Sequence, residues 1–232
     1  MIPARKSASL VIFGKFKVSD QLIYVKNLNA DRDTKDALRQ CLIASMNYQS
    51  TSKKSLEKSK TIIRKTNGIC EISSRSAAFT AASALKLQNW KDFDEMLPFT
   101  ACCPPVISNS MKIIGLAQQS KFDEALNELE NVLMLEETVF GTENFCVSEE
   151  ALDTLCEEIK KADDSVEKMK RFRNLQRLVT KYNRRTTKTI DDLLFSPLRV
   201  TSTSESRNSS QNSEFLNSQQ FENLVKDLPY QK

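Results

Sequence analysis

The sequence predicts an all-α fold, a solenoid of helical hairpins followed by a disordered C-terminal tail. Only 4 glycines and 6 prolines occur among 232 residues, too few for the many tight turns of a sandwich or barrel. Apolar residues recur at helical spacing in successive segments, which come in pairs joined by short turns. The aromatic residue that opens the second helix of a pair recurs after 32 residues, at Trp90 and Phe122. Periods in the thirties are typical of paired-helix solenoids.

The composition is that of a folded domain of ordinary polarity. The chain is 40% hydrophobic and 28% charged, and it is long enough to bury a sizeable core. No apolar run approaches the roughly 18–20 residues that a membrane-crossing helix needs. We therefore expect no membrane insertion.

Residues 1–30 allow two interpretations. They carry four basic residues before the first acid, Asp20, which would suit a mitochondrial presequence or a divergent leader. They also fit a partial N-terminal repeat, in which one helix ends at 10–13, the chain turns at Gly14 and a second helix covers 16–27. A resemblance described below favours the second interpretation.

Residues 31–138 are predicted to form consecutive helical hairpins. The predicted helices cover 33–48, a basic stretch from Leu56 to an Asn67-Gly68 turn, 73–87, 89–97, 104–119 and 120–137. We expect Ser73 or Ser74 to cap the alanine-rich third helix, and Ser120 to cap the last.

Residues 139–196 are expected to close the stack as a C-terminal helical cap. Ser148 is placed to cap a helix over 148–161, and a last long helix runs from about 165 to 185. The following residues, 197–232, are rich in Ser, Asn and Gln, which predicts a disordered tail.

Residue types that carry catalysis are scarce. Histidine is absent, which removes the usual general base and the most frequent zinc ligand. The six cysteines show no CxxC pair, and we interpret them as reduced and mostly buried. Adjacent acids such as Glu149 and Glu150 point about 100° apart on a helix. We therefore predict no metal, no cofactor and no catalytic activity.

The net charge of +4 conceals an uneven distribution. Lys and Arg outnumber Asp and Glu by 9 in residues 1–120, acids outnumber bases by 9 in 121–162, and bases are again in excess by 5 in 163–200. This basic–acidic–basic order indicates a polyanionic partner for the flanks. Ordinary solvated helix faces explain it equally well.

Two segments resemble the centre of a pentatricopeptide repeat, where a first helix ends in Gly-Leu and Asp-Glu-Ala-Leu opens the second. They are IIGLAQQSKFDEAL (113–126) and LVIFGKFKVSDQLIYVKNLN (10–29). Four further segments are similar, in order and rough spacing, to the C-terminal half of a mitochondrial member of the pentatricopeptide repeat family: TKDALRQCLIASMNY, SSRSAAFTAASALKL, VSEEALDTLCEEIK and TTKTIDDLLFSP. The resemblance covers about residues 8–200.

The resemblance implies a right-handed α–α superhelix in the mitochondrial matrix. It implies binding of single-stranded mitochondrial RNA, without catalysis, in mRNA processing and maturation that supports the respiratory chain, together with other RNA-processing proteins. The chain starts where the family would already be within a repeat, so we expect a fragment, a short isoform or a divergent member. The repeat pattern is degenerate between 30 and 104.

The resemblance also indicates a base-reading position. In such repeats the first helix of each pair lines the concave face, and one side chain near its start contacts a base edge. Alignment places Ser110 there, preceded by Asn109. The same offset from Trp90 leads to Ala78, which cannot hydrogen-bond to a base. An ordinary polar residue on a helix is the better explanation of Ser110.

The helix predicted over 165–185 carries the candidate phosphate contacts. At about 100° per residue, five cations fall within an arc of roughly 80°: Lys170, Arg173, Arg177, Lys181 and Arg184. The apolar residues of this helix cluster on nearly the opposite side, so the cations should point outward. Such a line matches a phosphate backbone. The alternative is a solvated face at the end of the stack.

An acidic helix over 122–137 supports a different function. It would repel RNA, so we expect it to be the outer helix of its pair, facing solvent or a protein. Together with the missing base-reading side chains, it favours the alternative of a helical-repeat adaptor that binds proteins and no RNA.

Overall fold

Helices make up most of the chain that the structure describes, which confirms the all-α class. The computed structural model describes residues 10–12, 25–26, 32–63, 71–134, 146–162 and 165–200. Its strands are short and pair in twos. They are β1 (Leu10–Ile12), antiparallel to β4 (Leu198–Val200), and β2 (Val147–Ser148), parallel to β3 (Arg185–Thr186).

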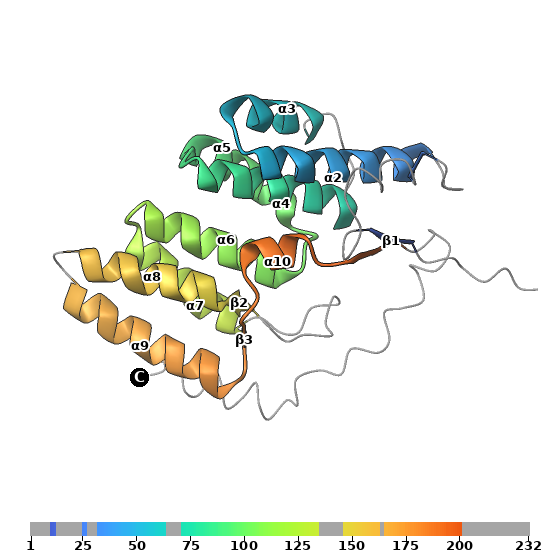
Figure 1. Ribbon diagram of the computed structural model, residues 1–232. Helices are drawn as coiled ribbons and strands as arrows, with labels where there is room; N and C mark the ends of the chain where they lie inside the picture. Colours follow the sequence, from blue (N-terminus) through green and yellow to red (C-terminus); the bar gives the residue numbers. More distant parts are fainter. Residues whose placement is uncertain are drawn as a thin grey trace, which may run out of the picture.

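The helices follow one another in pairs (Figure 1). The pairs are α2 (Arg32–Ser50) with α3 (Lys53–Ile63), α4 (Glu71–Lys86) with α5 (Trp90–Met96), α6 (Pro105–Gln118) with α7 (Phe122–Met134), and α8 (Glu149–Lys161) with α9 (Ser165–Lys181). A 3-10 turn, η1 (Leu97–Thr100), follows α5, and the short α10 (Ile190–Leu194) follows α9. The first helices pack on one another from α2 through α4 and α6 to α8, and α7 packs on α9. Each pair therefore covers its neighbour.

The two central pairs share one turn geometry. Gln88 (φ 52°) and Ser120 (φ 58°) lie in the left-handed region just after α4 and α6. In each turn the amide of the next residue donates to a carbonyl five residues earlier, at 2.9 Å, which is a Schellman closure. The turns lie 32 residues apart, like Trp90 and Phe122. Ser120 therefore ends α6, and the prediction that it caps the next helix is wrong.

α4 is the central helix, and 13 of its 16 residues are buried. Its small side chains let α2, α5 and α6 approach closely. The hydroxyls of Ser76, Thr80 and Ser83 donate to carbonyls one turn earlier, at 2.9–3.0 Å, so these buried polar atoms are satisfied. Because α4 begins at Glu71, Ser73 and Ser74 lie inside the helix, and the predicted cap there is wrong.

Two close contacts hold α5 in place. Gly115 of α6 lets Phe93 pack against the helix backbone, since a Cβ there would lie 2.4 Å from Phe93 Cε1. Between α3 and α5, the buried Lys60 Nζ lies 2.6 Å from Asp92 Oδ1. Burial is the largest single influence and would lower the pKa of Lys60, but its hydrogen bonds and charge interactions with Asp92 and Glu57 together outweigh burial and raise that pKa. The pair is therefore held in its charged form.

After α9 the chain returns across the first helices (Figure 1). α10 packs on α4 and α6, and β4 then pairs with β1. The guanidinium of the buried Arg75, on α4, donates to the carbonyls of Leu193 (3.0 Å), Leu194 (2.9 Å) and Ser196 (3.3 Å). Arg75 thereby caps the end of α10 and fixes the returning segment.

Two predictions about the ends of the chain are wrong. Residues 10–12 form β1 instead of the end of a helix, and 198–200 form β4 instead of part of a disordered tail. Each strand depends on a partner at the other end of the chain, which a local sequence pattern does not contain. The presequence alternative, the Gly14 turn and the tail from 201 on lie outside the described residues.

Candidate functional site

α9 closes the stack and presents one face outward. Phe172, Leu175 and Val179 are buried where α9 packs against α7 and α8. Beside this seam, the Arg171 guanidinium lies 2.7 Å from Glu130 Oε2 on α7, which fixes the rotation of the helix. The opposite face of α9 therefore points away from the stack, as the sequence predicts.

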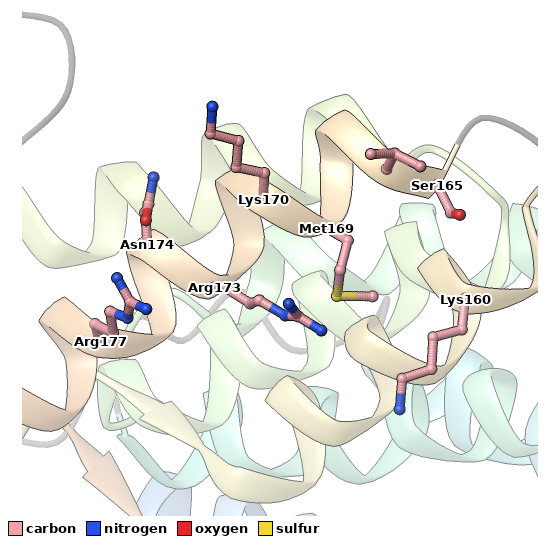
Figure 2. Close-up of a pocket in the computed structure, with 8 residues that line it drawn as sticks. Lys160, Ser165, Met169, Lys170, Arg173, Asn174 and Arg177 are labelled. Atoms are coloured by element: carbon pink, nitrogen blue, oxygen red, sulfur yellow. The ribbon is translucent and has the colours of Figure 1, made fainter.

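Three of the predicted cations on that face, Lys170, Arg173 and Arg177, are exposed and line a groove of about 630 Å³. Lys160 enters the same groove from the last turn of α8, and the Met169 side chain extends into the space between the two helices (Figure 2). Within the described part of the chain none of the four cations has an ion-pair partner. We call Lys160, Lys170, Arg173 and Arg177 the groove cations.

Other cations, on α6, α8, α9 and β3, pair with acids. The pairs are Lys112–Glu128 (2.6 Å), Lys161–Glu158 (2.6 Å), Arg171–Glu130 (2.7 Å) and Arg185–Glu149 (3.0 Å). Glu157 and Glu167 are exposed on the same two helices but do not line the groove. Positive charge therefore gathers in the groove without a direct ion-pair partner among the described residues.

Arg184 does not belong to this line of cations. α9 ends at Lys181, and Asn183 then adopts a φ of 51°, so the chain leaves the helix before Arg184. Arg184 is 3% exposed, and its carbonyl accepts the Cys146 amide at 2.9 Å. Lys181 is exposed but lies outside the groove, with its Nζ 5.0 Å from the ring centroid of Tyr182. The prediction that Arg184 points outward is wrong.

Ser110 and Asn109 serve the fold. Ser110 is 0% exposed, and its Oγ accepts the amide of Ser148 at 2.8 Å. Asn109 Nδ2 donates to the carbonyl of Cys146 at 3.2 Å. Both side chains therefore tie α6 to the segment that enters α8. Because a base cannot reach a hydroxyl without exposed surface, the base-reading role predicted for Ser110 is wrong.

α10 occupies the face of the first helices, where the resemblance would place RNA. Asp191 accepts a hydrogen bond from the hydroxyl of Tyr48, on α2, and lies 3.2 Å from Nζ of Lys86, on α4. The amide of Ile190 donates to Glu150 of α8 at 2.6 Å. These contacts tie α10 to three of the first helices, so α10 covers part of their face and leaves a small pocket of about 140 Å³ beside it.

The described cysteines are unpaired, and three of the five are buried, as predicted. Burial raises the pKa of the Cys103 thiol to about 12 and that of Cys146 to about 11, which suppresses the nucleophilic thiolate. No cluster of three or more metal-ligating side chains is found among the described residues. None of the described helices is both long and apolar enough to cross a membrane.

Lys160 is the groove residue that sequence reasoning missed. It belongs to another helix than the other groove cations, and only the short connection between α8 and α9 brings it beside them. Two adjacent lysines at the end of the helix that precedes a basic helix are the signal that would have found it.

No protein-family model, curated protein or solved structure matches the chain.

Proposed function

We propose that this chain is a non-catalytic RNA-binding protein of the helical-repeat type, a right-handed α–α superhelix, whose α8–α9 groove contacts single-stranded mitochondrial RNA. The observation that carries the proposal is the set of four groove cations without acidic partners. A groove that gathers cations and excludes acids attracts a polyanion and supplies affinity through its phosphates.

The spacing of the groove cations suits one strand. Lys170, Arg173 and Arg177 stand one helical turn apart on α9, so they cover about 10 Å at 1.5 Å per residue. Lys160 lines the same groove from α8. Each phosphate neutralised on a single strand adds about 0.7 to the slope of log K against log salt. Four contacts therefore give a slope of about −3.

The proposed binding carries little sequence information. Phosphate contacts position a strand but do not read its bases, and the residue expected to read a base, Ser110, is buried. The mitochondrial matrix and a role in mRNA processing for the respiratory chain follow from the sequence resemblance. Other RNA-processing proteins are the partners proposed to supply selectivity.

Charge reversal in the groove tests this function. The test variant is Lys170→Glu/Arg173→Glu/Arg177→Glu. The control is Lys53→Glu/Lys54→Glu/Lys58→Glu, which changes the net charge equally at exposed lysines of α3. Affinity for single-stranded RNA is measured across a salt series by fluorescence anisotropy. We expect the groove variant to lose at least tenfold in affinity and most of the salt slope, whereas the control keeps the slope. Equal effects of both variants would contradict the proposal.

The alternative of a protein-binding adaptor has its own support. The acids Asp123 and Glu124 are exposed on α7, which is a second helix of its pair, and Phe99 is 49% exposed on η1. An adaptor predicts no salt-dependent RNA binding, together with capture of a protein partner that is lost in Asp123→Lys/Glu124→Lys. The adaptor alternative is excluded if RNA affinity is lost only when the groove cations are replaced.

A further inference from the structure

The α8–α9 groove holds apolar surface among its cations. Val166, in the first turn of α9, is 84% exposed. Met169 lies one turn further and is half-buried, with its thioether in the space between the two helices (Figure 2). Lys160 and Arg173 approach the same space from α8 and α9. Contacts to phosphate alone would not require this apolar surface.

Apolar surface flanked by cations matches the chemistry of a nucleotide. The faces of a base are flat and weakly hydrated, and a polarisable methionine side chain contacts aromatic rings favourably. A phosphate lies on either side of each nucleoside, and a cation stands on each wall of the groove to receive it. The volume of about 630 Å³ lies within the roughly 300–1,000 Å³ usual for small-molecule sites. The groove is therefore large enough to admit one base.

A duplex cannot use this site in the same way. Its bases are stacked and paired inside the double helix, so the groove would meet only sugars and phosphates. A base that is unpaired can turn out of its strand and lie against the protein.

We propose that the α8–α9 groove selects single-stranded RNA, because it takes one unpaired base against Met169 and Val166 while Lys160 and Arg173 hold the neighbouring phosphates. This inference rests on the proposed function and adds the place where an unpaired base lies, against Met169 and Val166.

Three probes test the inference on the full chain. They are a single-stranded RNA of about 12 nucleotides, the same strand annealed to its complement, and an abasic strand of equal length that keeps every phosphate. We expect the single strand to bind about tenfold more tightly than the duplex and about fivefold more tightly than the abasic strand. The salt slopes of the intact and abasic strands should agree, because their phosphates are the same.

A gain-of-affinity variant tests where the base lies without endangering the fold. Val166→Trp replaces an exposed side chain by an aromatic platform. We therefore expect the intact strand to bind about fivefold more tightly, and the affinity for the abasic strand to stay unchanged. The matched control is Met46→Trp, at an exposed apolar position of α2, which should change neither affinity.

The outcomes separate this inference from the proposed function. If the wild-type chain binds none of the three probes, the proposed function fails. If it binds all three equally well with a steep salt slope, RNA binding stands and selection of single strands is overturned. An affinity for the intact strand that Val166→Trp leaves unchanged or weakens also overturns the placement of the base.

Discussion

The face of the first helices and the α8–α9 groove both contain cations, but among the described residues only the cations of the first region have ion-pair partners. Arg75 is 1% exposed and donates to three backbone carbonyls, and Lys86 lies against Asp191. Arg173 and Arg177 are exposed and lack ion-pair partners in the described part of the chain. The number of cations in a segment therefore does not locate a polyanion site. What locates such a site is whether the cations already have partners inside the fold.

The most severe way to break the region that α10 covers is Arg75→Met. The change removes the Arg75 donor from three carbonyls at the end of α10. Leu193 keeps its hydrogen bonds from Ser196, but the carbonyls of Leu194 and Ser196 lose their donor, which should cost about 3 kcal/mol of unfolding free energy. Urea unfolding measures it. Arg173→Met, the matched change in the groove, should stay within about 0.5 kcal/mol. Similar losses for the two variants would show that the contrast between the regions has no energetic basis.

Alkaline pH tests the buried interior next. The pKa values of Cys103, Cys146 and Tyr48 are raised, with burial as the largest cause. Their protonated forms therefore stabilise the fold fully below the unfolded pKa values of about 8.5 and 10, and this contribution is lost as pH rises beyond them. We expect the unfolding free energy to fall by about 2 kcal/mol between pH 8 and roughly 9.3. In Cys103→Ala/Cys146→Ala most of this pH dependence should vanish, and an unchanged slope would assign it to other groups.

Gly115→Ala tests the packing between α5 and α6. The new methyl group would overlap the Phe93 ring, so we expect a loss of about 2 kcal/mol despite the better helix propensity of alanine. Phe93→Leu in the same chain should recover part of the loss, because it removes the clashing ring atoms. Thermal unfolding of the single and double variants decides. A stabilised single variant would mean that α5 moves aside freely.

The smallest expected effect comes from replacing one lysine in each region, which compares the two regions most directly. Lys86→Met removes the cation that lies 4.0 Å from the centroid of the Tyr48 ring, and it should cost about 0.5–1 kcal/mol of stability without affecting RNA affinity. Lys170→Met should do the reverse, lowering RNA affinity and leaving stability unchanged. Parallel measurements of unfolding and of RNA anisotropy test the crossover. If each variant alters both properties, the two regions are not independent.

Helices and the outward line of cations were predictable because both follow from local spacing. The periodicity of α9 placed Phe172 and Leu175 inward and Lys170 and Arg173 outward, as the structure has them. Ser148 was predicted as the cap of α8, and its side chain does accept the amide of Ala151. Each of these depends on residues within a few turns of one another.

What the sequence missed depends on contacts between distant segments. Ser110 is buried because Ser148, 38 residues later, bonds to it. Arg184 is buried because β3 pairs with β2 and turns the chain inward after α9. A longer α9 would have pointed Arg184 outward. The partial cover of the first-helix face arises from α10, whose apolar residues gave no indication of the helices they would meet.

The pairing of Leu10 with Val200 has a consequence for how the protein is made. At about 5–20 residues per second, the ribosome adds the partner of β1 roughly 10–40 s after β1 itself. During that time the helical pairs can stack in order, but the strand stays open and Arg75 lacks the carbonyls that it later holds. A nascent chain that ends before β4 would therefore leave the β1 strand unpaired and Arg75 without its carbonyl partners. An unpaired strand edge is a feature that chaperones protect from aggregation.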